Sequence, residues 1–238
     1  MSPTRFVSPS TRVVGVPDGR RQAAGLASAT ALLVVAVLTG LSWHGHVAAV
    51  DRAATSSLLQ ASGSGGFTLA KVVSLLGSGP VVAAIALAVG AAVWHRTRDA
   101  AAALVTPIAA GAGGVVELVA KHLVARPRPA TAWLTGESGN GFPSGHATGF
   151  TAMAVAACTA LAIGELWPRR RGLACWVAGS GSAVVALARV AVGAHYVFDA
   201  AAGVLLGVVC ALSTAQLLPL LHNRVSPILR RAAGKRRR

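Results

Sequence analysis

Apolar runs of about 20 residues recur along this chain, and they constrain its fold more than any other feature. A helix needs about 20 mainly apolar residues to cross the hydrocarbon core of a bilayer. The runs cover residues 23–43, 72–94, 100–120, 147–167, 173–192 and 195–221. With 54% hydrophobic and only 12% charged residues, the chain is predicted to be an all-α, polytopic membrane protein, a bundle of six transmembrane helices.

Two of these runs leave an alternative open. The second is interrupted by Gly77-Ser78-Gly79-Pro80, so an alternative is that its helix begins at Pro80 and not at residue 72. The first follows a basic segment, as a secretion signal would, but it is longer than the 7 to 15 residues or so of a signal core, which favours an uncleaved anchor. We therefore expect a basic cytoplasmic segment at 1–22, a single membrane domain at 23–221 and a basic cytoplasmic tail at 222–238.

The positions of the cations predict the orientation in the membrane. Lys and Arg flanking the spans are retained in the cytoplasm, and here they gather at 5–21, 96–98, 169–171 and 224–238. With six spans, all four segments fall on one side, which is then the cytoplasm of a multi-pass plasma-membrane protein. The loops on the other face hold three clusters of polar residues, so the sequence places them together on the extracytoplasmic side.

The formal net charge of +15 does not indicate nucleic-acid binding, because the cations are divided among the inner loops and a basic tail. Such tails more often contact anionic lipid headgroups, so membrane lipids are the expected partners. Cys158, Cys175 and Cys210 lie inside apolar runs without metal-like spacing and are interpreted as small buried residues. His44 and His46 have no carboxylate or cysteine nearby in the sequence, so no metal site is predicted.

The first polar cluster is Lys121 with Arg128-Pro129, and it follows the third apolar run. The prolines of the Arg126-Pro127-Arg128-Pro129 stretch end the helix, and the cations suit a phosphate oxyanion. Interfacial cations that reach headgroups remain an alternative, as does a helical ion pair between Glu117 and Lys121.

The second cluster is Pro143-Ser144-Gly145-His146, directly before the fourth run. Ser144 can cap that helix and Gly145 permits a close backbone approach, so the helix start is suited to an anion. His146, in the first turn, could protonate a leaving oxygen. By itself, this tetrapeptide is better explained as a helix cap with an interfacial histidine.

The third cluster runs from Arg189 through His195 to Asp199. Gly193 predicts a tight turn, with Arg189 at the end of one helix and His195 at the start of the next. Asp199 lies four residues after His195, on the same helical face. A carboxylate there would hold one tautomer of His195 and stabilise the cation that forms when the free nitrogen attacks.

Taken together, Lys-x6-Arg-Pro, Pro-Ser-Gly-His and Arg-x5-His-x3-Asp resemble the three-part signature of the type 2 phosphatidic acid phosphatase superfamily. The signature spans 121–199, and the six-helix layout extends the resemblance over most of the chain. This resemblance implies that His195 attacks phosphorus to form a phosphohistidine, that Asp199 orients it, and that His146 protonates the leaving group. It assigns the phosphoryl oxygens to five residues: Lys121, Arg128, Arg189, Ser144 and Gly145. Arg126 is left as an accessory or headgroup-facing cation.

The implied function is that of an integral membrane phosphatase acting on a lipid phosphate or pyrophosphate. The fixed cations would take the place of a metal, so no cofactor is expected. Polyprenyl pyrophosphate or a related envelope lipid is the first expectation, while phosphatidate and phosphatidylglycerol phosphate stay open, as does the oligomeric state. One position departs from the family, where a serine usually precedes the arginine of the third part and this chain has Ala188. A non-catalytic protein that binds or transports anionic lipid is the alternative.

Overall fold

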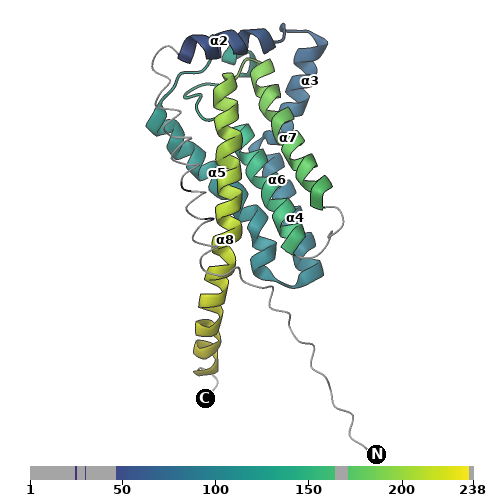
Figure 1. The fold of residues 1–238 in the computed structure, drawn as a ribbon, viewed down its shortest axis with the longest axis vertical. Coiled ribbons are helices and arrows are strands. Elements are labelled where there is room, and N and C mark those ends of the chain that lie inside the picture. Colours follow the sequence, from purple (N-terminus) through teal and green to yellow (C-terminus); the bar gives the residue numbers. More distant parts are fainter. Residues whose placement is uncertain (1–24, 26–29, 31–46, 164–170, 236–238) are drawn as a thin grey trace, which may run out of the picture.

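The computed structural model describes residues 25, 30, 47–163 and 171–235, with the side chains of 47, 48, 162, 163, 171 and 218–235 left aside. Within these residues the regular structure is helical, apart from one isolated bridge between Pro127 and Asn140. The elements, in chain order (Figure 1), are α2 Val47–Leu58, α3 Gly65–Ser74, the 3₁₀ helix η1 Leu75–Gly77, α4 Gly79–Thr97, α5 Ala100–Val124, the 3₁₀ helix η2 Ala130–Thr135, α6 Gly145–Ile163, α7 Arg171–Ala191 and α8 Val197–Lys235.

Four of the described helices are long and apolar enough to cross a membrane. They are α4, α5, the part of α7 from Gly172 to Ala191 and the part of α8 from Val197 to Leu217. Together with the apolar α6, they correspond to five of the six predicted runs. The first predicted run, 23–43, lies outside the described residues except for the helical positions Gly25 and Thr30. The prediction of an all-α, polytopic membrane fold is confirmed.

The second predicted run does not form one continuous helix. Residues 72–74 belong to α3, the chain tightens through η1, and a new helix, α4, starts at Gly79 with Pro80 in its first turn. Proline is tolerated there because the first amides of a helix have no partner within it. The alternative start at Pro80 was therefore correct to within one residue, and the start at residue 72 was wrong.

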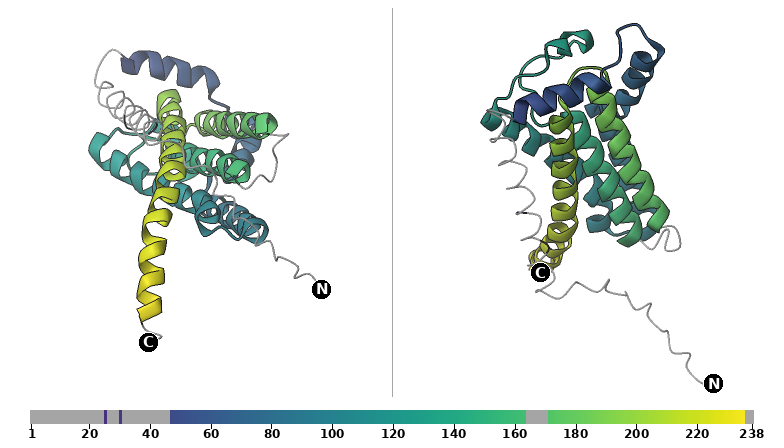
Figure 2. Two further views of the ribbon diagram at one scale, coloured as in Figure 1. Left: turned by 60° about the horizontal axis from the view of Figure 1, so that its bottom comes forward. Right: turned by 45° about the horizontal axis from the view of Figure 1, so that its top comes forward.

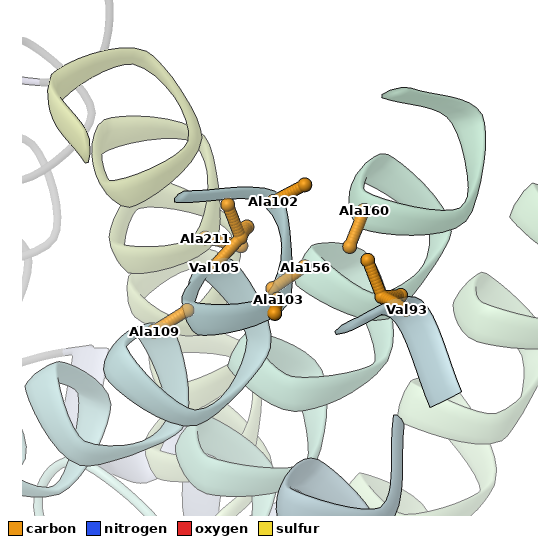
Figure 3. Close-up of a cluster of buried hydrophobic side chains, with 8 residues drawn as sticks. All are labelled: Val93, Ala102, Ala103, Val105, Ala109, Ala156, Ala160 and Ala211. Carbon is orange, nitrogen blue, oxygen red and sulfur yellow. The ribbon is translucent and has the colours of Figure 1, made fainter. Parts of the chain in front are cut away.

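Helix α6 occupies the middle of the bundle, where it packs against α4, α5, α7 and α8 (Figures 1 and 2). Its contacts with α5 and α8 are built largely from alanine and valine. One such cluster joins four helices through Val93, Ala103, Val105, Ala156 and Ala211, among others (Figure 3). Small side chains let helix backbones come close together inside a membrane, where no hydrophobic driving force pulls them together.

Two glycines of α8 allow the closest approach to α6. A Cβ atom at Gly203 would lie 2.6 Å from the carbonyl oxygen of Ser144, and one at Gly207 would lie 2.6 Å from that of Thr148. No larger residue fits against backbone at that separation. The start of α6 and the start of α8, which carry the second and third polar clusters, are therefore held together.

The two ends of the bundle differ. Helix α2 lies across one end, above the start of α8 (Figure 1). The short turn between α4 and α5 lies at the other end, where Asp99 caps α5 by accepting hydrogen bonds from the amides of Ala101 and Ala102 at 2.8 and 3.1 Å. Asp99 follows Arg98 directly, so the cations of this turn are separated from the polar clusters by the length of the bundle.

Candidate active site

The three polar clusters meet at the end of the bundle covered by α2. The amide of Ser144 donates to the carbonyl oxygen of Asp199 at 2.9 Å, which joins the second cluster to the third. Arg128 Nη1 lies 3.0 Å from His195 Nε2, which joins the first to the third. Residues predicted from separate stretches of sequence thus share one site.

His195, on which the predicted chemistry depends, is almost completely buried. Only 1% of its surface is exposed, and it follows Gly193, whose positive φ of 73° makes the turn between α7 and α8. Burial lowers the pKa of His195 to about 4, because desolvation disfavours the charged imidazolium more than Asp199 favours it. At neutral pH the ring is uncharged, which is the form that can act as a nucleophile.

The two nitrogens of the His195 ring face different groups. Nδ1 lies 3.7 Å from Asp199 Oδ2, so the two residues face each other beyond hydrogen-bond distance. Nε2 points to Arg128 and lies 3.8 Å from a carboxylate oxygen of Glu137. The arrangement leaves Nε2 as the atom directed toward Arg128 and the carboxylate of Glu137. It leaves Nδ1 as the atom directed toward Asp199.

Asp199 is fully buried and is held from three directions. Arg126 Nη1 donates to Oδ1 at 2.5 Å, and the amide of Tyr196 donates to Oδ2 at 3.0 Å. Gly141 packs against it, since a Cβ atom there would lie 3.2 Å from Oδ2. The carboxylate that faces His195 is therefore fixed in position before any ligand arrives.

The interpretation of Arg126 as a headgroup-facing cation is wrong. Its side chain is buried, bridges Asp199 and Asp51, and lies 4.3 Å from the centre of the Tyr196 ring. Ala125 adopts a left-handed conformation with φ of 49° directly after α5, where the chain leaves the helix. Sequence spacing alone could not distinguish the burial of Arg126 from that of Arg128, two residues later.

Asp51 of α2 is a functional candidate that sequence reasoning missed. It is fully buried, accepts from Arg126 Nη2 at 2.7 Å, and accepts from the amide of Phe198 at 3.1 Å. Thr55, one turn later, accepts from the amide of Val197. These bonds satisfy the free amides at the start of α8. The sequence did offer one indication of Asp51, which is that the chain has only 7 acidic residues. A carboxylate near a membrane rarely lacks a partner.

Arg128 and Arg189 converge on a second carboxylate that was not predicted, that of Glu137. Arg128 Nη1 donates to Glu137 Oε2 at 2.5 Å, and Arg189 Nη2 contacts Glu137 Oε1. Arg128 also donates to the carbonyl oxygens of Ser138 and Ala194. The two predicted phosphate-binding arginines therefore hold an anionic group directly beside the nucleophile candidate.

Lys121, in the last turn of α5, forms the helical ion pair with Glu117 at 2.5 Å that the sequence allowed. Gly145 approaches the same carboxylate, since a Cβ atom there would lie 2.7 Å from Glu117 Oε1. His146 follows in the first turn of α6, half-buried. A side chain at residue 145 would therefore have to move the Glu117 carboxylate.

Ser144 precedes α6 at the position predicted for a cap, but its hydroxyl does not cap the helix. The residue is fully buried, and its Oγ has no hydrogen-bond partner among the described residues. Arg189 Nε and His195 Nδ1 are likewise buried and unpaired within the described chain. Buried polar atoms without partners are costly, and three of them around one cluster are suited to a polar ligand.

An apolar groove of about 480 Å³ opens beside the site between α4, α5 and α6. Glu117, Gly145 and His146 line its polar end, and glycine, alanine, valine, leucine and proline side chains line the rest. The groove includes Gly111 and Gly114, whose missing Cβ atoms would meet nothing within 4 Å. The groove is thus apolar along most of its lining and has ionisable residues at one end.

Ala188 faces away from this site. It packs in an apolar cluster with Phe67 and Ala70 of α3 and with Val192 and Ala194. A hydroxyl at this position would enter that apolar cluster. The departure from the usual serine therefore concerns the packing of α3 against α7.

Comparison with known proteins was consistent with this geometry. The family model described as "PAP2 superfamily" matches residues 100–222, which include all three polar clusters. The chain is similar in structure to a transmembrane PAP2-type phosphatidylglycerolphosphate phosphatase from Bacillus subtilis, with a TM-score of 0.72 and 20% sequence identity. The match covers 83% of this chain and 96% of that one. No curated protein matches the chain in sequence.

Proposed function

Because the chain belongs to the PAP2 superfamily, we propose that it is an integral membrane lipid phosphatase that works through a phosphohistidine on His195. The observation that supports this most directly is the position of His195 Nε2. It lies 3.0 Å from Arg128 Nη1, beside an anion that Arg128 and Arg189 both hold. A phosphoryl group held by these arginines would sit within reach of an uncharged imidazole.

In the proposed reaction, His195 Nε2 attacks phosphorus as the bond to the leaving oxygen breaks. Asp199, fixed by Arg126 and the Tyr196 amide, stabilises the positive charge that develops at Nδ1. His146 donates a proton to the leaving oxygen and then helps a water molecule to attack the phosphohistidine. Arg128, Arg189 and Lys121 neutralise the phosphoryl oxygens, and Ser144 Oγ and the Gly145 amide donate to them.

The apolar groove between α4, α5 and α6 supports a lipid as the substrate. Its polar end is formed by Glu117, Gly145 and His146, so a hydrocarbon chain in the groove would place the headgroup near the proposed proton donor. Polyprenyl pyrophosphate or a related envelope lipid is our first candidate. Phosphatidate and phosphatidylglycerol phosphate belong in the same test, the latter because the similar solved structure is described as its phosphatase.

The test is phosphate release by detergent-solubilised protein from a panel of these lipids in excess chelator, since the fixed cations are proposed to replace a metal. We expect release from at least one lipid, inhibition by vanadate, and loss of turnover by His195→Ala. His95→Ala is the matched control, because His95 is exposed in the last turn of α4. Near-normal turnover by His195→Ala would refute the assignment of His195 as the nucleophile. A strict requirement for magnesium would refute metal independence. Absence of phosphate release from every lipid would favour a non-catalytic lipid-binding protein.

We further propose that the site faces the extracytoplasmic side of the plasma membrane. The cations Arg96 and Arg98 lie near the α4–α5 turn, at the end opposite the site, and such cations are retained in the cytoplasm. Single cysteines introduced at Asn140 and at Arg98 should be labelled by an impermeant reagent from outside and from inside the cell, respectively. Labelling of both from the same side would refute this orientation.

A further inference from the structure

The carboxylates of this chain are concentrated at the proposed site. Four of the five acidic residues that the structure describes lie there. Each contacts a cation, in the ion pairs Lys121–Glu117, Arg126–Asp51, Arg126–Asp199, Arg128–Glu137 and Arg189–Glu137. Four cations and four carboxylates cancel, so the site carries no net charge while both histidines are neutral. A dianion gains little from a neutral site unless one carboxylate leaves.

Glu137 differs from the other three carboxylates in its setting. Asp51 and Asp199 are fully buried, and Glu117 is fixed on α5 one turn from Lys121. Glu137 lies on the loop after η2, between Gly136 and Gly139, which both have positive φ. Its side chain is 21% exposed. It is the most exposed carboxylate of the four.

The Glu137 carboxylate occupies the place that the proposed reaction requires for phosphoryl oxygens. It bridges Arg128 and Arg189, and its Oε2 lies 3.8 Å from His195 Nε2. A phosphoryl group held by the same two arginines and attacked by the same nitrogen would overlap it. Binding of substrate therefore requires an exchange of one anion for the other.

Such an exchange depends on the charge of the incoming group. A phosphodiester carries one negative charge, as a carboxylate does, and would have to displace a group tethered at millimolar effective concentration. A phosphomonoester carries about −1.5 to −2 at neutral pH and has more acceptor oxygens. The exchange favours the doubly charged group and disfavours the singly charged one.

We propose that Glu137 is a specificity-determining residue, a displaceable counter-ion that reserves Arg128 and Arg189 for phosphomonoester or pyrophosphate groups and excludes the phosphodiester headgroups of bulk membrane lipids. The proposal rests on the proposed function, because it takes the two arginines as the phosphoryl-binding groups. It adds the reason why phosphodiester lipids, which surround the site in the membrane, would not occupy it.

Equilibrium binding tests this without turnover. Inorganic phosphate and dimethyl phosphate, as dianionic and monoanionic probes, are titrated into detergent-solubilised full-length protein at pH 7.5 by calorimetry. We expect the wild type to bind phosphate at least tenfold more tightly than dimethyl phosphate. Glu137→Gln, which keeps the size of the side chain and removes its charge, should bind both probes about tenfold or more tighter than the wild type, because both probes displace the same carboxylate. Ser138→Ala, on the same loop with an exposed side chain, is the control and should match the wild type.

Glu137→Ala removes the competing group altogether and must change binding in the same direction, which keeps the test decisive if the glutamine variant does not fold. Unchanged phosphate affinity in a folded Glu137 variant would overturn the inference, as would equal binding of the two probes by the wild type. If the wild type binds phosphate but releases none from any lipid, the proposed function fails and this comparison still decides the role of Glu137.

Discussion

Replacement of Arg126 by methionine should destabilise the protein far more than the same replacement of Arg128. Arg126 pairs at 2.5 and 2.7 Å with Asp199 and Asp51, both with fully buried carboxylates. Removal of one partner from a buried ion pair typically costs about 3 to 5 kcal/mol, because the remaining charge stays buried without compensation. Here two carboxylates lose the same cation, so we expect a loss at the upper end of that range. Arg128 instead pairs with the partly exposed Glu137, and its loss should cost about 1 to 2 kcal/mol.

The assay is thermal unfolding in detergent, followed by intrinsic tryptophan fluorescence. For 150 to 250 residues, about 1 kcal/mol corresponds to 2 to 4 °C in Tm, so Arg126→Met should lower Tm by about 10 to 20 °C. Arg128→Met should lower it by only a few degrees while turnover is lost. A fall in Tm for Arg126→Met no larger than that for Arg128→Met would refute the assignment of Arg126 as the central buried cation.

The pH dependence gives a second readout for Arg126→Met. Burial raises the pKa of Asp51 even while Arg126 opposes that shift, so loss of the cation should raise it further. A carboxyl group whose pKa is raised by folding binds more protons in the folded state than in the unfolded state. The free energy of unfolding of the variant therefore falls as pH rises and recovers as pH falls. The difference in Tm between Arg126→Met and the wild type should narrow from pH 7 toward pH 5. A difference that is constant over this range would contradict this account.

Three further predictions concern the groove, the nucleophile and the departure from the family pattern. Gly114→Leu, which fills the groove, should raise KM for a long-chain lipid phosphate about tenfold and leave hydrolysis of para-nitrophenyl phosphate unchanged. Gly179→Leu, at an open helical glycine outside the groove, should change neither, and equal effects of the two substitutions on KM would argue against the groove as the lipid site. Because burial holds the pKa of His195 near 4 and protonation blocks attack, the acidic limb of kcat/KM that belongs to this residue should lie near pH 4. A profile with its acidic limb at about 6.5 and a slope of two protons there, with no further limb near pH 4, would contradict this burial. Ala188→Ser should leave kcat unchanged and lower the free energy of unfolding by about 1 kcal/mol, because the hydroxyl would enter an apolar cluster. A several-fold rise in kcat would instead show that the hydroxyl reaches the reacting group.

The residues of the proposed chemistry could be predicted from local spacing because each group performs a task that few residue types can perform. His195 and Asp199 lie four apart at a helix start, and Ser144, Gly145 and His146 precede an apolar run. A helix brings such neighbours onto one face whatever the rest of the chain does. The apolar runs likewise predicted the helices, since a bilayer demands length and composition more than detail.

The tertiary structure decided which charges meet, and the sequence contains no local signal for those pairs. Arg126 and Arg128 are two residues apart, yet one is buried between Asp51 and Asp199 and the other faces His195. The partner Asp51 lies 75 residues before Arg126, and Glu137 reaches Arg189 across 52.

Contacts over such separations depend on how helices pack, above all on the close approach of α6 and α8 at Gly203 and Gly207. Helix periodicity orients a side chain on its own helix, but a low-dielectric interior fixes its counter-ion only after the bundle has assembled. By itself, the sequence determined a membrane-embedded helical chain with phosphate-type chemistry. Only the packed bundle decided that each of the three arginines of the site contacts a carboxylate, because those contacts depend on positions in space that no local pattern specifies.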